Sequence, residues 1–164
     1  MIQIENLVKR YGDTLALDHL NLEIQEGEIF GLLGPNGSGK TTALNCLLAL
    51  LKYDRGEIRI FDRPMTPVSY DIRRQIGVVF QNVAVFGQMS VWENIDFFCG
   101  LYVPDKERRR RLVEDALIFA GLESYRKKRP RQLSGGLLRR LNIACGIAHR
   151  PRLIILDEPT VAVD

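Results

Sequence analysis

The stretch that decides the fold is Gly34-Pro35-Asn36-Gly37-Ser38-Gly39-Lys40-Thr41. It fits the phosphate-loop pattern G-x-x-x-x-G-K-[ST]. Glycines let the backbone bring successive N–H groups around a phosphate, and the helix that follows presents its positive end. Lys40 is expected to reach the β- and γ-phosphates, and the Thr41 hydroxyl to ligate Mg²⁺. The sequence therefore predicts a nucleoside triphosphate site.

The flanks of this loop give it the context that the motif requires. The apolar run at 29–33 predicts a buried strand before the loop, and residues 41–51 predict a helix after it. The alternative is a glycine-rich turn that contains an incidental lysine. A strand-to-helix turn at this point favours the phosphate loop over that alternative.

Composition is that of an ordinary globular protein. The chain has 164 residues, of which 46% are hydrophobic and 26% charged, enough for one domain with a sizeable core and a small second lobe. No apolar run approaches ~18 residues and the N-terminus lacks a signal-peptide pattern, so we expect neither a membrane span nor export. A net charge of +3 is too weak to indicate a nucleic-acid partner. Three scattered cysteines predict buried thiols rather than a disulfide or metal site.

Helical signals gather in the middle of the chain. Residues 1–33 alternate as strands do, and short strands are predicted at 57–61 and 76–80. After an irregular stretch, Ser90 and Glu93 have capping-box spacing, and a second helix is predicted from Asp105 to Gly121. Residues 82–132 therefore form a helical insert in an otherwise α/β domain. The basic runs 108–111 and 126–131 are interpreted as a solvated helix face and a surface loop.

The last part of the chain supplies two consecutive carboxylates. Ser134 is placed to cap a third helix, Pro151 ends it, and the apolar run 153–156 predicts a buried strand that delivers Asp157 and Glu158 at its carboxyl end. A phosphate-loop enzyme needs one acid to hold Mg²⁺ and one to position or deprotonate a water. The alternative is that Asp157 and Glu158 are only the polar end of a strand. The phosphate loop upstream favours the catalytic interpretation over this alternative.

Taken together, the motifs resemble those of the ATP-binding cassette (ABC) ATPases over nearly the whole chain. The order of the motifs, with Leu-Ser-Gly-Gly between Gln81 and the carboxylates, is nearly unique to that family. The matching positions are Tyr11 as the adenine-stacking aromatic, 34–41 as Walker A, Gln81 as the Q-loop glutamine, 133–136 as the signature, 153–157 as Walker B, Glu158 as the catalytic glutamate and 161–164 as the D-loop. From the sequence alone, Tyr11 fits equally well as a half-exposed aromatic at a strand end.

The resemblance implies a fold and a set of site residues. The implied fold is α/β, with a P-loop NTPase core of mainly parallel sheet and flanking helices, an N-terminal antiparallel β portion and the helical insert. The implied domains are 1–81 as the nucleotide-binding core with the β portion and Walker A, 82–132 as the helical subdomain, and 133–164 as the signature helix, Walker B and D-loop. The implied catalytic residues are Glu158, Lys40 and Gln81, and the implied Mg²⁺ ligands are Thr41, Gln81 and Asp157. The implied ATP-binding residues are Tyr11, Gly34, Pro35, Asn36, Gly37, Ser38, Gly39, Lys40, Thr41, Thr42, Ser134, Gly135, Gly136 and Asp164.

The resemblance also implies partners. Two cassettes, identical or different, would sandwich two ATP molecules between the Walker A of one and the signature of the other. Residues 82–102 would dock on a transmembrane permease at the cytoplasmic face of the membrane, and the stretches 89–95 and 158–161 resemble exporter cassettes. No nucleic-acid partner is expected. A soluble ABC ATPase of the translation-factor or assembly type, and a nucleotide-binding module without turnover, remain the alternatives.

Two departures from the family pattern bear on these expectations. Leu137 stands where glutamine commonly follows the signature. The family continues beyond the position of Asp164 through further strands and a switch histidine, so the sequence is similar to a C-terminally shortened cassette in which hydrolysis is expected to be weak. His19 and His149 do not match the switch histidine and are expected to be structural or exposed.

Overall fold

The computed structural model describes residues 1–157. The chain divides into two compact units, Met1–Arg73 and Arg74–Asp164, which are described separately. The finer division at residues 82 and 133 is a functional one and stays a prediction.

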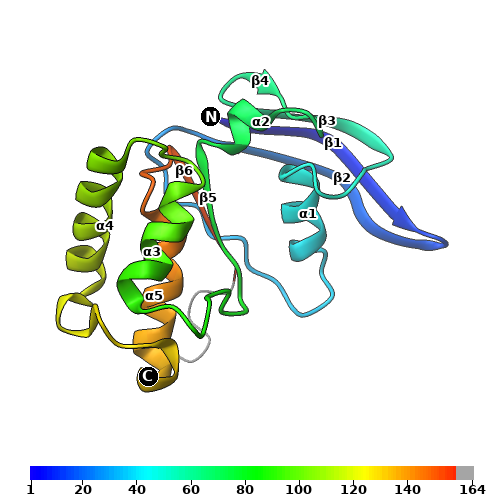
Figure 1. Cartoon of the computed structure of the whole chain (residues 1–164). Helices are drawn as coiled ribbons and strands as arrows, with labels where there is room; N and C mark the ends of the chain where they lie inside the picture. The colour runs from blue at the N-terminus through cyan, green and yellow to red at the C-terminus, as the bar shows by residue number, and fades with distance from the viewer. Residues whose placement is uncertain (158–164) are drawn as a thin grey trace. The chain divides into compact units, whose positions relative to one another are not determined.

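The first unit is built on an antiparallel sheet (Figure 1). Its strands are β1 (Ile2–Tyr11), β2 (Thr14–Ile24), β3 (Arg55–Ile60) and β4 (Arg63–Pro64), in the order β2-β1-β3-β4. The unit also contains α1 (Lys40–Leu47) and the short α2 (Tyr70–Arg73). The expected antiparallel β portion is therefore present, and α1 is shorter than the predicted helix at 41–51.

Turn residues and a close backbone contact fix this sheet. Gly12, at φ 56°, lies in the tight turn that joins β1 to β2, where Tyr11 pairs with Thr14. Gly56 has φ 106°, and a Cβ there would lie 2.6 Å from the carbonyl oxygen of Glu5, so only glycine lets β3 approach β1 at this point. Alternate residues at the start of β1, including Ile2 and Ile4, are buried, as the period of a strand requires.

The strand predicted at 29–33 is wrong. These residues have no strand assignment, and Ile29 is 100% and Leu33 93% exposed. A strand exists through hydrogen bonds to a neighbouring strand. The part of the chain that the structure describes pairs no strand with this run, so apolar composition alone does not make it one.

The second unit combines a parallel strand pair with helices. The strands β5 (Ile76–Val79) and β6 (Leu153–Leu156) pair in parallel, with Val79 opposite Leu156. The helices are α3 (Val91–Gly100), α4 (Lys106–Ala120) and α5 (Gly135–Ile147), with short 3₁₀ turns at Glu123–Tyr125 and Pro130–Gln132. A Cβ on Gly77 would lie 2.6 Å from the carbonyl oxygen of Gly146, so glycine allows β5 and α5 to pack closely.

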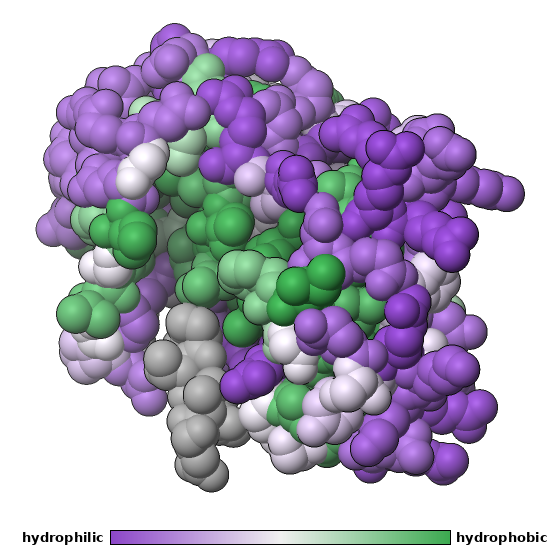
Figure 2. Space-filling model, turned by 90° about the vertical axis from the view of Figure 1, so that its left-hand side faces the viewer, coloured by the Kyte–Doolittle hydropathy of each residue, from purple (hydrophilic) through white to green (hydrophobic). Residues whose placement is uncertain are grey.

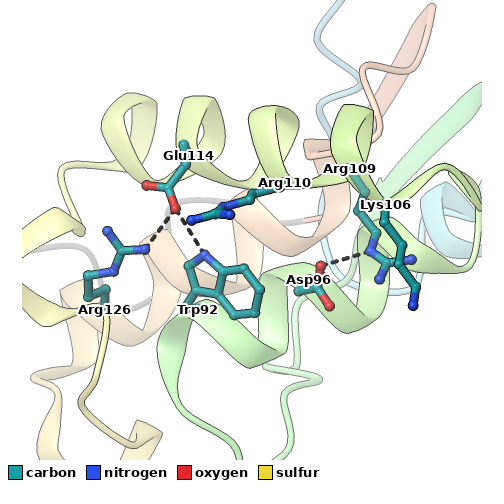
Figure 3. Close-up of a pocket in the computed structure, with 7 residues that line it drawn as sticks. All are labelled: Trp92, Asp96, Lys106, Arg109, Arg110, Glu114 and Arg126. Atoms are coloured by element: carbon teal, nitrogen blue, oxygen red, sulfur yellow. Dashed lines mark hydrogen bonds and ion pairs between the residues drawn. The ribbon is translucent and has the colours of Figure 1, made fainter.

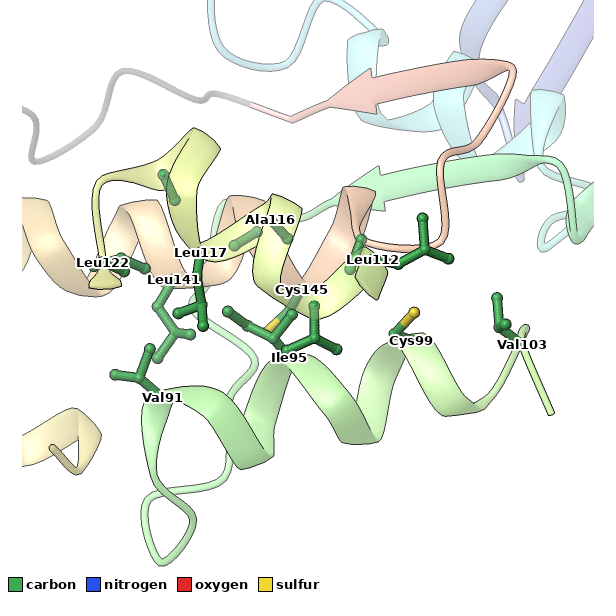
Figure 4. Close-up of a cluster of buried hydrophobic side chains, with 14 residues drawn as sticks. Val91, Ile95, Cys99, Val103, Leu112, Ala116, Leu117, Leu122, Leu141 and Cys145 are labelled. Carbon is green, nitrogen blue, oxygen red and sulfur yellow. The ribbon is translucent and has the colours of Figure 1, made fainter. Parts of the chain in front are cut away.

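Helix starts and ends follow the sequence signals. Ser90 and Glu93 form the capping box of α3, Asp105 caps α4, and Gly121 ends α4 in the left-handed conformation. Figure 4 shows apolar side chains of α3, α4 and α5 meeting in one buried cluster. The cluster contains five apolar residues of α4, which are Leu112, Val113, Ala116, Leu117 and Ala120.

The three thiols are free and buried, as predicted. Burial raises the pKa of Cys99 to about 11 and that of Cys145 to about 12. Both thiols are therefore protonated and unreactive near neutral pH. No helix within residues 1–157 is long and apolar enough to cross a membrane.

Candidate functional site

The phosphate loop has a backbone that only glycine permits at several positions. Gly37 has φ 82° and Gly39 has φ 92°, both in the left-handed region. A Cβ on Gly34 would lie 2.6 Å from Ser38 Oγ, and one on Gly39 would lie 2.6 Å from the carbonyl oxygen of Ala16. Lys40 Nζ donates to the carbonyl oxygens of Gly34 at 2.7 Å and Pro35 at 3.0 Å, across the loop. The geometry fits a phosphate cradle and makes an incidental glycine-rich turn the weaker interpretation.

The helix after this loop begins without a side-chain cap. Gly39 is the N-cap of α1, makes no side-chain hydrogen bond, and no acidic residue lies in the first turn. The other three helices of eight or more residues in the described chain, α3, α4 and α5, are capped by Ser90, Asp105 and Ser134. The first N–H groups of a helix need an acceptor and favour a negative charge. The start of α1 is thus suited to bind an anion, together with the half-buried Lys40.

We predict that Gly39→Ala destabilises the first unit. The new methyl group meets the Ala16 carbonyl at 2.6 Å in a backbone conformation that alanine rarely adopts, so a loss of about 1–3 kcal/mol in the free energy of unfolding is expected. Urea unfolding measures it. Gly31→Ala is the matched control, because Gly31 has open space and no positive φ. A Gly39→Ala protein as stable as the Gly31→Ala protein would contradict the strained loop geometry.

Tyr11 lies at the end of β1, where the hairpin turns. Its side chain is 51% exposed, and Lys9 Nζ lies 5.2 Å from the centre of its ring. An exposed ring at a strand end can stack on a base, but it fits a surface aromatic equally well. The adenine contact therefore stays a prediction.

The carboxyl ends of β5 and β6 bring Gln81 and Asp157 side by side. The Asp157 N–H donates to the Val79 carbonyl at 2.9 Å, which continues the parallel ladder by one residue. The Gln81 and Asp157 carbonyls both accept from the guanidinium of Arg139 on α5, at 3.0 and 3.4 Å. Two of the predicted site residues thus meet at one edge of the sheet, as expected for parallel strands.

Three buried polar residues of α3 and α5 were not predicted from the sequence. Arg139, Asn142 and Asn94 are only 3%, 6% and 0% exposed. Asn94 Nδ2 donates to the carbonyls of Phe86, Met89 and Ser90, so it holds the irregular loop before α3. Their sequence signal is weak, because a polar residue on a helix is normally assigned to the exposed face.

The start of α5 presents the signature residues. Ser134 Oγ accepts from the Leu137 N–H at 3.3 Å, which confirms Ser134 as the N-cap. Gly135 and Gly136 have ordinary φ angles, and a Cβ on either would meet nothing within 4 Å. Unlike the glycines of the phosphate loop, these two are not required by the fold of the described chain.

A separate pocket of about 320 Å³ lies between α3, α4 and the loop that follows α4 (Figure 3). Its two carboxylates are paired: Glu114 binds Arg126 at 2.7 Å and accepts from Trp92 Nε1 at 3.1 Å, and Asp96 binds Arg109 at 2.8 Å. The other residues that line it are Lys106 and Arg110. The ion pairs that line the pocket join the helices of the insert to each other and to the loop that follows α4. Arg108, Arg110 and Arg111 are exposed, as predicted for the basic run.

Neither histidine belongs to the candidate site. His19 is exposed beside Asp18. His149 is buried and stacks on the ring of Tyr102, with ring centres 3.9 Å apart, and burial lowers its pKa. Both therefore fit the structural or exposed roles expected of them.

Other members of the candidate site are divided between the units or lie beyond the described residues. Thr41 belongs to the first unit, and Gln81 and Asp157 to the second. Residues 1–157 contain no cluster of three or more His, Cys, Asp and Glu side chains that could hold a metal by itself. A Mg²⁺ ion that keeps waters and takes ligands from phosphates needs no such cluster. Glu158, Asp164 and the 161–164 stretch lie outside the described residues.

The sequence of this chain is similar to those of known proteins that form one family. Residues 17–161 match the family described as ABC transporter. The chain is 41% identical over 164 residues to the spermidine/putrescine import ATP-binding protein PotA of Nitratidesulfovibrio vulgaris, covering 100% of the chain and 44% of PotA. It is 41% identical to the probable sulfate/thiosulfate import ATP-binding protein CysA of Chlorella vulgaris, covering 99% of the chain and 69% of CysA. It is 39% identical to Nod factor export ATP-binding protein I of Burkholderia thailandensis, covering 99% of the chain and 54% of that protein.

Solved structures agree. The ATP-binding cassette MJ0796, in a dimeric post-hydrolysis state bound to ADP and Pi, is 34% identical with a TM-score of 0.85, covering 100% of this chain and 76% of that one. The cbiO1 protein of Clostridium perfringens, part of an ABC transporter complex, is 32% identical with a TM-score of 0.90, covering 99% and 67%. The chain belongs to the ABC transporter family and has the P-loop NTPase fold of its cassettes. It spans about half the length of most of the curated relatives it matches.

Proposed function

We propose that the chain is the ATP-binding and ATP-hydrolysing part of an ABC transporter subunit. The observation that carries the proposal is the phosphate loop at 34–41. Its glycines are required by the backbone, Lys40 lies across it, and it leads into a helix that no side chain caps. Bound phosphate would supply the acceptor and the negative charge that this helix start lacks.

The chain's own residues take distinct roles in this proposal. Loop N–H groups and Lys40 are proposed to hold the phosphates, and Thr41 and Asp157 to hold Mg²⁺. When bound, Mg²⁺ neutralises charge on the phosphates. Gln81 touches the metal or the attacking water, and Glu158 accepts a proton from that water. Thr42, in the first turn of α1, is proposed to contact ATP as well.

A second cassette completes each site in the proposed mechanism. Glycine costs roughly 0.5–1 kcal/mol in a helix, yet Gly135 and Gly136 face open space. We infer that a group from outside the chain approaches Gly135 and Gly136 closely, so that a side chain at either position would obstruct it. The N-terminus of α5, with the Ser134 hydroxyl, suits the γ-phosphate of an ATP held by the partner cassette. The dimer of MJ0796 supports this arrangement.

We predict that Gly135→Ala separates stability from activity. In the isolated chain, alanine at this open helical position raises the free energy of unfolding by about 0.5 kcal/mol. In the ATP-bound dimer the methyl group obstructs the phosphate approach, so turnover falls while ATP still binds to the phosphate loop. Urea unfolding, ATP binding and phosphate release measure the three effects. Undiminished turnover would contradict the proposed cross-interface role of the signature.

Residues 82–102 are proposed to dock on a permease. Several large apolar side chains of this segment are at least 39% exposed, namely Val83, Phe86, Phe97, Leu101 and Tyr102. Figure 2 shows apolar patches among polar residues on one face of the molecule. The names of the relatives support a transporter subunit, which would be attached to the cytoplasmic face of the membrane. Co-purification with membranes, lost on mutation of Phe97, would support this; a subunit never found with membranes would favour the soluble alternative.

Export stays a prediction. The relatives include proteins named for import and for export, so they support transport without a direction. Transport of a labelled substrate in oriented vesicles decides it.

A further inference from the structure

Arg139 is a buried cation in the second turn of α5, 3% exposed. A buried charge is costly unless its hydrogen bonds are satisfied. Its Nη1 atom donates to the carbonyl oxygens of Phe80 at 2.8 Å and Gln81 at 3.0 Å, and its Nη2 atom donates more weakly to that of Asp157 at 3.4 Å. One guanidinium therefore joins the two segments that leave the carboxyl ends of β5 and β6.

Asn142 holds the same segment from the next turn of α5. It is 6% exposed; its Nδ2 donates to the Phe80 carbonyl at 3.2 Å, and its Oδ1 accepts from the Ala84 N–H at 3.2 Å. Residues three apart lie on one face of a helix. This face of α5 thus holds both ends of the segment 80–84. Its hydrogen bonds go to backbone atoms of the segment and so do not depend on the segment's side chains.

We propose that Arg139 is a positioning residue that fixes Gln81 relative to Asp157 and transmits displacements of the signature helix to both. The proposal rests on the proposed function, in which the first turn of α5 binds the partner's nucleotide. Arg139 lies about one turn further along the same helix, so a shift of α5 on nucleotide contact moves the carbonyls of Gln81 and Asp157 together. Arg139 itself does not touch nucleotide; it acts through the two residues that do.

The test compares Arg139→Met, Arg139→Lys and Asn142→Ala with Arg111→Met, which removes a 79% exposed arginine from α4. Hydrogen exchange of the Ala84 amide and its neighbours is measured without nucleotide. Asn142→Ala and Arg139→Met should speed exchange there by roughly tenfold, the effect of losing one or two net hydrogen bonds. Arg139→Lys should be intermediate, because an ammonium lacks the planar fork. Arg111→Met should leave the segment unchanged.

The kinetic constants for ATP hydrolysis distinguish a positioning role of Arg139 from a purely structural one. Arg139→Met is expected to lower kcat about tenfold or more with KM for ATP within about twofold, because the phosphate loop is untouched. Partial recovery of kcat in Arg139→Lys is expected. Unchanged exchange at 80–84 in Arg139→Met, or kcat and KM that move only with the folded fraction, would overturn the inference. If the wild-type protein hydrolyses no ATP even when extended to the length of its relatives, the proposed function fails, and the exchange result still decides the anchoring by Arg139.

Discussion

Replacing Lys40 by methionine is expected to remove most of the stabilisation of the protein by ATP. The ammonium donates to the loop carbonyls of Gly34 and Pro35 and so lies at the loop proposed to hold the phosphates. A ligand at 100 times its Kd stabilises the folded state by about 2.7 kcal/mol. Losing the charge-assisted contact should weaken binding about 10²-fold, which removes most of that gain at the same ATP concentration.

Thermal unfolding with and without Mg-ATP measures this effect. Lys52→Met is the matched control, because Lys52 is an exposed lysine a few residues beyond α1. The control should keep the full shift in Tm with ATP, and both variants should unfold like the wild type without it. An equal ATP-dependent shift in the Lys40 variant would contradict the phosphate-loop assignment.

Changing Glu158 to glutamine is expected to stop turnover while ATP binding persists. A general base contributes typically 10²–10⁴-fold to rate, so kcat should fall by at least about 10²-fold. Asp157, directly before it, is anchored by its N–H to Val79 and by its carbonyl to Arg139, so the preceding backbone is fixed. Phosphate release measures kcat, and the persistence of ATP binding shows that the site is still formed.

The control for this change is Glu123→Gln, an exposed carboxylate in the 3₁₀ turn after α4. It should leave turnover unaltered. A Glu158→Gln protein that hydrolyses ATP at the wild-type rate would exclude Glu158 as the base. A wild-type protein that binds ATP without turnover, even when extended to the length of its relatives, would favour the nucleotide-binding module.

Local signals predicted most elements of the second unit. Ser90, Asp105 and Ser134 marked helix starts because their side chains satisfy N–H groups that every helix leaves free. The apolar residues of α4 recur at helical spacing and form its buried face, because one side of a helix must pack on its neighbours. The apolar runs at 76–80 and 153–156 predicted β5 and β6, but not their parallel pairing with each other.

Long-range contacts explain what the sequence did not predict. The run 29–33 has the composition of a strand, but a strand depends on a partner that composition does not specify. Arg139 and Asn142 bind backbone atoms about 60 residues away, so their burial depends on the position of β5 and not on their own helix. The phosphate loop was the easiest part of the site to find, because its glycines and lysine are consecutive in sequence.

Equilibrium dialysis with labelled ATP measures whether residues 34–41 bind Mg-ATP. We predict saturable binding of about one ATP per chain that is lost in Lys40→Met and kept in Lys52→Met and Glu158→Gln. Absence of saturable binding, both in this chain and in a version extended to the length of its relatives, would show that residues 34–41 are not a nucleotide site.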